Sequence, residues 1–154
     1  MSEFAAEVVS LEPTAVAVVR ETVPMNELTS FFDRAFHAVA EAVGAQGVAL
    51  AGPPFGAYYG MPTDTVDVAA GFPVQREVVA TGDVVASTLP GGRAAQVMHV
   101  GSYDSLGQTY DQLFGWMRQQ GLTPDSMMWE SYLTEPDADN PDATLTRITW
   151  PIVQ

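Results

Sequence analysis

The sequence predicts an α+β domain made of two β-α-β-β halves that share one antiparallel sheet with two helices packed on it. One observation is that the order of elements repeats at an offset of about 78 residues. A second is that a single half has too few strands and too little helical cover to bury its own faces. Paired about a pseudo-two-fold axis, the halves would form one sheet with a ligand cleft where they meet. We expect a single domain over residues 1–154, with repeats at about 5–75 and about 83–154.

The first half begins with Thr14–Val23, a segment rich in valine and alanine that predicts a strand. A helix follows, for which Asn26 is the expected N-cap and Gly44 marks the end. Its apolar stripe consists of Leu28, Phe31, Phe32, Ala35, Val39 and Val43. Two further strands are predicted, an aromatic one at Phe55–Tyr59 and one at Val66–Ala70. The half closes with the sequence Phe72-Pro73-Val74.

The second half repeats this order. A strand is predicted at Arg93–Val100, then a helix entered through Gly101-Ser102-Tyr103, and then strands at Met127–Leu133 and Leu145–Thr149. The predicted apolar side of the helix consists of Leu106, Tyr110, Leu113, Phe114 and Met117. The closing sequence Trp150-Pro151-Ile152 matches Phe72-Pro73-Val74, and the aromatic segments around Tyr58-Tyr59 and Trp129-Glu130 occupy matching places. Between the halves we expect a strand at Asp83–Leu89 and a hairpin turn at Pro90-Gly91-Gly92.

Composition excludes several classes of function. The net charge is −13, from 19 acidic and 6 basic residues, so no basic cluster exists for direct contact with nucleic acid. No apolar run reaches the roughly 20 residues of a membrane span, and the first residues lack the basic start of a secretion signal. The chain has no cysteine, which excludes disulfides, thiolate metal sites and cysteine nucleophiles. A cytoplasmic location is the expectation.

Glu130 is the most informative candidate residue because it lies inside an apolar and aromatic segment. In a strand, Met128, Glu130 and Tyr132 share one face, and Trp129 and Ser131 share the other. A carboxylate among such neighbours is costly to bury unless it is paired or protonated. One interpretation is a solvated glutamate on an exposed sheet face. The other is a pocket carboxylate that pairs with a cationic or donor-bearing ligand.

Aromatic side chains accompany Glu130 in both halves. We expect them to line the pocket together with Met128, because Tyr and Trp offer flat apolar faces that attract cations. The group consists of Phe55, Tyr58, Tyr59, Trp129, Tyr132 and Trp150. For each of them alone, ordinary core packing is the favoured interpretation; it is the group, repeated in both halves around a carboxylate, that indicates a pocket. His37 and His99 are isolated and show no metal-ligand spacing, so neither a metal nor a cofactor is expected.

Three segments carry a recognisable pattern. They are Val97–Leu106 at the entry to the second helix, Trp129–Pro136 with its Glu-x-Tyr-Leu-x-x-Pro pattern, and Thr149–Ile152 with its closing x-x-Pro-Ile strand. Together they resemble a known family, the gyrase-inhibitor-like domains, also called AraC-type effector-binding domains. The resemblance spans residues 5 to 153. It implies a duplicated strand-helix-strand-strand fold with a cleft between the halves, and its central glutamate maps onto Glu130.

The resemblance leaves three activities open. In multidrug-responsive transcription regulators such a domain binds bulky, lipophilic and often cationic compounds, which favours stand-alone binding of a small molecule here. Other stand-alone members hydrolyse cyclopropane-bearing genotoxins, in which case Glu130 would be the general base and Tyr103 a candidate donor. A third type inhibits DNA gyrase, for which the acidic charge would mimic DNA to a protein partner. Exposed sheet edges would also allow two copies to pair as a homodimer.

Overall fold

In the computed structural model of the protein, residues 6–60, 63–101, 105–134 and 144–153 are described. They form an α+β architecture of two α-helices and nine strands in one sheet, which confirms the predicted fold class. Neither helix of the described chain has the length and apolar composition needed to cross a membrane. The elements are β1 (Ala6–Leu11), β2 (Thr14–Pro24), α1 (Leu28–Ala45), β3 (Phe55–Tyr59), β4 (Thr65–Pro73), β5 (Val85–Leu89), β6 (Gly92–Val100), α2 (Leu106–Gln119), β7 (Thr123–Pro124), β8 (Met127–Tyr132) and β9 (Leu145–Val153).

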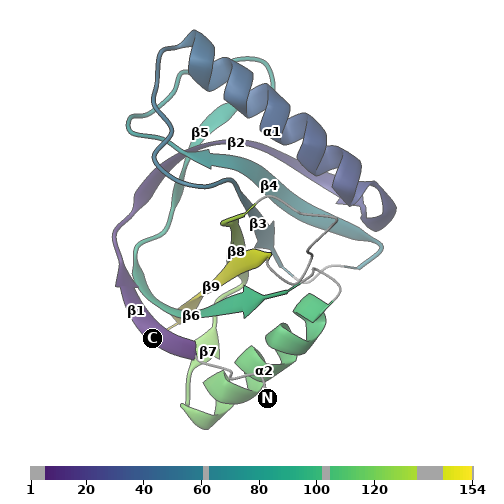
Figure 1. Cartoon of the computed structure of the whole chain (residues 1–154), viewed down its shortest axis with the longest axis vertical. Coiled ribbons are helices and arrows are strands. Elements are labelled where there is room, and N and C mark those ends of the chain that lie inside the picture. Colours follow the sequence, from purple (N-terminus) through teal and green to yellow (C-terminus); the bar gives the residue numbers. More distant parts are fainter. Residues whose placement is uncertain (1–5, 61–62, 102–104, 135–143, 154) are drawn as a thin grey trace.

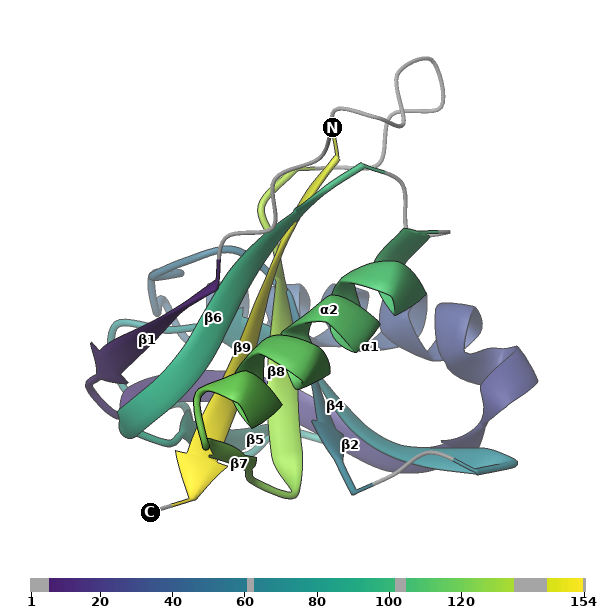
Figure 2. The ribbon, with the colours of Figure 1, turned by 90° about the horizontal axis from the view of Figure 1, so that it is seen from below.

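The strands form a strongly curled antiparallel sheet in the order β1-β6-β9-β8-β3-β4-β2-β5, with β7 beside β9. β3 and β8 meet at the centre, and the order of elements outward from them is the same on both sides: β4, β2 and β5 on one, and β9, β6 and β1 on the other. α1 packs against β2 and β4, and α2 packs against β6 and β7. Figure 1 shows α1 above and α2 below, with β3 and β8 between them; Figure 2 gives the perpendicular view.

Two bent segments of chain, β1 with β2 and β5 with β6, connect the two ends of the sheet. β1 leads into β2 through Glu12-Pro13, and β5 leads into β6 through Pro90-Gly91. β1 pairs with β6 and β2 pairs with β5 in one continuous register, so the four strands form a single kinked two-stranded ribbon. A Cβ on Gly91 would lie 2.7 Å from the Pro13 Cδ, so the two kinks touch. The predicted hairpin at 90–92 is therefore wrong: the chain bends there, but β5 and β6 do not pair with each other.

Both faces of the curled sheet are apolar at its centre. On the helix-covered face, Phe31 and Val39 of α1 share a core with Val19 of β2. Leu113 of α2 shares another with Val97 and Ile148 of the sheet. The opposite face has its own core of Val16, Val18, Phe55, Ala57, Ala69, Leu89 and Trp129. Each large buried side chain stabilises the fold by about 1.5–3 kcal/mol. The central strands of the sheet therefore lie between apolar cores on both of their faces.

Two sequence expectations differ from the structure. α1 is preceded by a 3-10 turn at Met25–Glu27, which encloses Asn26 within the turn; no side chain caps this end of the helix. Asn26 is therefore not the N-cap. The strand β1 was not predicted, because its short sequence Ala-Glu-Val-Val-Ser-Leu has only weak alternation and is half-exposed.

Candidate functional site

Glu130 lies in the middle of β8, on the face that the two helices cover. Its neighbours across the sheet are Ile148 of β9 and Gly56 of β3. The residue is only 6% exposed, which excludes the interpretation of a solvated glutamate. In the register of β3 and β8, Gly56 stands opposite Glu130 and Tyr58 stands opposite Met128.

Two tyrosines hold the Glu130 carboxylate. Tyr132, two residues further along β8, donates its hydroxyl to Oε1 at 2.9 Å, and Tyr110 of α2 donates to Oε2. Tyr58 of β3 forms a hydrogen bond with Tyr132. A tyrosine hydroxyl has one proton, and Tyr132 gives its proton to Glu130, so Tyr58 must be the donor in the second bond. The result is a buried chain of hydroxyls that ends on one carboxylate.

Burial dominates the electrostatics of this chain. Desolvation raises the pKa of Glu130 above its ordinary value, and the hydrogen bonds from Tyr110 and Tyr132 and the nearby His99 partly offset that rise. Desolvation and the neighbouring Glu130 raise the pKa values of Tyr58 and Tyr110 far above those of free phenols. The phenols therefore remain protonated donors at any physiological pH. Among the described residues, no Arg or His forms an ion pair with Glu130.

Phenylalanines from α1 complete the surroundings of Glu130. The Phe32 ring meets Tyr58 and Tyr132 edge-on, at centroid distances of 6.4 and 6.1 Å, and stacks on Phe36 at 5.7 Å. Gly56 makes this approach possible, because a Cβ there would lie 2.7 Å from the Phe32 ring. In the strand opposite the carboxylate, a glycine thus admits an aromatic ring from the helix.

A second polar group lies beside the tyrosines. His99 of β6 is buried, with Nδ1 2.7 Å from the Thr109 hydroxyl and Nε2 3.2 Å from the Ser105 hydroxyl, both near the start of α2. The Thr146 side chain stands between His99 and Tyr132 in the register of the sheet. Its hydroxyl is completely buried and has no hydrogen-bond partner within the described structure. The cross-strand row of His99, Thr146 and Tyr132 is therefore polar. The next row on the same face holds Val97 and Ile148 and is apolar on β6 and β9.

The structure divides the predicted pocket residues into two groups. Tyr58, Met128 and Tyr132 share the face of Glu130, as strand alternation predicts. Phe55, Tyr59 and Trp129 point to the opposite face and belong to its core, and the Arg20 guanidinium covers the Tyr59 ring at 3.7 Å. The expectation that these three residues surround Glu130 is wrong, because odd and even positions of a strand face opposite ways.

Trp150 and Tyr103 were also predicted site residues. The Trp150 indole donates to the Asp125 carbonyl at 2.9 Å and packs on Phe114 and Tyr110, so it supports Tyr110 rather than Glu130. Tyr103 lies outside the described residues. No group of three or more metal-binding side chains occurs in the described part of the chain.

Sequence reasoning assigned Tyr110, Phe32 and Phe36 no place in the site. Tyr110 and Phe32 were interpreted only as members of apolar helix stripes. A tyrosine within such a stripe is a signal for a buried hydroxyl that needs an acceptor. Glu130 of β8 is the acceptor of the Tyr110 hydroxyl in the structure.

The curled antiparallel sheet with its two helices is shared with the C-terminal domain of EcmrR. The EcmrR C-terminal domain superposes with a TM-score of 0.81 at 21% identity, over 98% of both chains. EcmrR in its DNA complex superposes with a TM-score of 0.85 at 22% identity and covers 98% of this chain, which spans 58% of that chain. At such identities the likeness is one of fold.

The chain belongs to the family of GyrI-like small-molecule-binding domains, whose model matches residues 5–153. A hydrolase from Listeria innocua shares the fold, with a TM-score of 0.67 at 16% identity over 96% of this chain and 91% of the other. SAV2435 bound to tetraphenylphosphonium gives a TM-score of 0.60 at 14% identity over 99% and 94%. No curated protein matches the sequence.

Proposed function

We propose that the protein binds bulky apolar cations, with Glu130 as the counter-charge. The observation that carries this proposal is a buried carboxylate whose hydrogen-bond partners in the described structure are neutral hydroxyls. Such a group loses its hydration on folding without gaining an ionic partner, so a cation would compensate it. The rings of Phe32, Tyr58 and Tyr132 lie within reach and would attract a cation through their faces.

The ligand would enter between α1 and α2, over the central strands β3 and β8. The four aromatic side chains that border Glu130 on this side are Phe32, Tyr58, Tyr110 and Tyr132, and all four are half-buried rather than fully enclosed. A lipophilic cation would replace their solvent contacts with aromatic contacts. Sensing or sequestration of such compounds is the proposed role, in line with the family and with the tetraphenylphosphonium-bound relative.

Titration with tetraphenylphosphonium tests the proposal. We expect binding to the unaltered protein by calorimetry and a loss of roughly 30-fold in Glu130→Gln, which keeps the shape of the side chain. Glu41→Gln on the exposed face of α1 removes the same charge and is the matched control. Equal weakening in both variants would show that net charge, and not the Glu130 site, attracts the cation.

A second candidate function is hydrolysis of a strained electrophile. The specific observation is the contact of Tyr110 with Glu130, which places a hydroxyl donor beside a carboxylate of raised pKa. The fold shared with the Listeria innocua hydrolase is consistent with it. Incubation with a cyclopropane-bearing compound would then yield product in molar excess over protein, and Glu130→Ala would abolish it. Product limited to one equivalent would indicate binding alone.

A further inference from the structure

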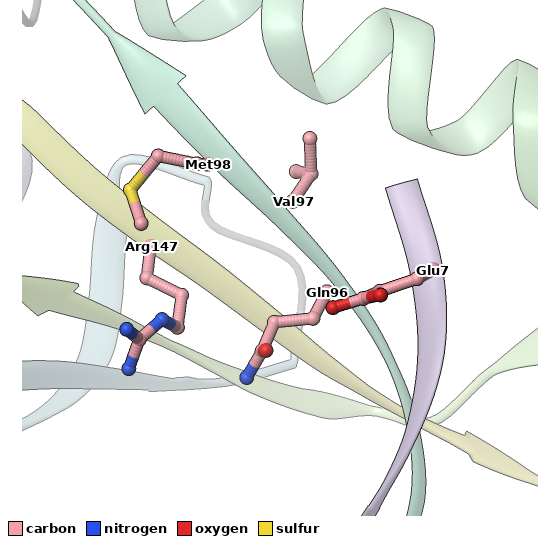
Figure 3. Close-up of a pocket in the computed structure, with 5 residues that line it drawn as sticks. All are labelled: Glu7, Gln96, Val97, Met98 and Arg147. Atoms are coloured by element: carbon pink, nitrogen blue, oxygen red, sulfur yellow. The ribbon is translucent and has the colours of Figure 1, made fainter. Parts of the chain in front are cut away.

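A groove of about 240 Å³ lies on the face of the sheet opposite to Glu130. Figure 3 shows Arg147 and Gln96 extending to one side of the strands and Val97 to the other. Strand alternation explains this arrangement, because Arg147 precedes Ile148, whose side chain shares the face of Glu130. The sheet itself therefore separates the groove from the Glu130 site. The lining residues are Glu7, Gln96, Val97, Met98 and Arg147.

Among the arginines that form no ion pair in the described part of the chain, Arg147 is half-buried, whereas Arg76, Arg93 and Arg118 are exposed. The chain has only 6 basic residues against 19 acidic ones, and Arg20 and Arg34 form ion pairs with Asp67 and Glu21 at 2.8 and 2.6 Å. The Arg147 guanidinium forms no ion pair or side-chain hydrogen bond with any described residue. A guanidinium stays ionised and carries five N–H donors in a planar fork, so its donors are available to a ligand.

Polar and apolar groups flank this guanidinium. Gln96 donates one amide hydrogen to the Thr149 hydroxyl at 3.0 Å and retains a second N–H. Met98 lies opposite Arg147 in the register, and Val100 follows on the same face of β6. These two side chains are 39% and 63% exposed, which makes a short apolar strip beside a free cation.

We infer that this groove binds a small apolar molecule that carries a single carboxylate. The carboxylate would accept two hydrogen bonds from Arg147 and one from Gln96, and the apolar body would cover Met98 and Val100. Glu7 at the rim and the net charge of −13 disfavour a second negative charge. The two faces of the sheet would thus take ligands of opposite charge, and this inference does not depend on cation binding at Glu130.

The test uses 1-naphthoate as the probe, with 1-naphthylmethylammonium as a probe of similar shape and opposite charge. We expect naphthoate to bind and the ammonium compound not to bind in this groove, as followed by chemical-shift changes of Met98 and Val100. Arg147→Gln should weaken naphthoate binding roughly tenfold. Glu7→Gln should strengthen it by removing a like charge. Arg93→Gln, at an exposed position on the neighbouring strand β6, removes an equal positive charge and is the control.

Equal weakening in Arg147→Gln and Arg93→Gln would overturn the inference, as would absence of naphthoate binding to the unaltered protein. If Arg147→Gln fails to fold by circular dichroism, Glu7→Gln decides, and an affinity that does not increase would refute the site. Naphthoate binding should persist in Glu130→Gln. Loss of tetraphenylphosphonium binding therefore bears on the proposed function alone.

Discussion

Replacing Tyr132 by phenylalanine removes one donor from the Glu130 carboxylate and keeps the ring that meets Phe32. The lost bond is a buried, charge-assisted one of 2.9 Å. Hydrogen bonds to charged groups contribute about 1.5–3 kcal/mol, and 1.36 kcal/mol corresponds to one pKa unit. Because the donor favours the ionised form, its loss should raise the pKa of Glu130 further, by about one to two pH units.

Cation binding reports this change. Only the ionised carboxylate attracts a cation, so affinity for tetraphenylphosphonium should rise with pH through the pKa of Glu130. In Tyr132→Phe the midpoint of this rise should move to higher pH by about one unit or more. Calorimetric titrations across a pH series measure it, with Tyr59→Phe on the opposite face as the control. An unchanged midpoint in Tyr132→Phe would refute the role of Tyr132 as a donor to the carboxylate.

Three further predictions concern stability. Glu130→Gln should be more stable than the unaltered protein at neutral pH and lose that advantage in acid. Folding raises the pKa of Glu130, so the unaltered protein loses stability as the pH rises above the pKa that Glu130 has in the unfolded chain. Thermal melts at several pH values measure this. Gly71→Ala should unfold the domain or lower its free energy of unfolding by more than about 3 kcal/mol, because the new Cβ would lie 1.9 Å from the Ala17 carbonyl oxygen. Gly115→Ala in α2 places its Cβ in open space and should raise the free energy of unfolding by about 0.5–1 kcal/mol. Urea denaturation measures both. Thr146→Val should raise stability by about 1 kcal/mol in the same assay, because it removes a buried hydroxyl without a partner; a loss of stability would indicate that the hydroxyl is satisfied.

Local patterns were sufficient to predict the fold class and the central residue of the site. The spacing of Phe31 and Val39 predicted α1, and alternation within β8 placed Glu130 and Tyr132 on one face and Trp129 on the other. Both signals come from neighbours along the chain, where the geometry of a helix or strand fixes the direction of each side chain.

The remaining features depend on pairing between distant segments. The match of Glu130 with Gly56 rests on the register of β3 and β8, which a one-residue slip would reverse. The bend at Gly91 has the sequence of a hairpin, and only its contact with Pro13, far away in the chain, makes it a kink. The choice of Tyr110 and Phe32 as neighbours of Glu130 likewise depends on how α1 and α2 sit on the sheet.

The kinked ribbon has a consequence for how the two sides of the sheet behave. β1 precedes α1 in the chain yet completes the sheet beside β6, and β5 precedes α2 yet completes the sheet beside β2. A chain severed at the exposed Gly82 would therefore give two fragments, each holding the edge strand of the other. Such fragments would need each other to complete their sheets. The interlocking joins the supports of α1 and α2 in one framework and fixes the spacing of the two helices on either side of Glu130.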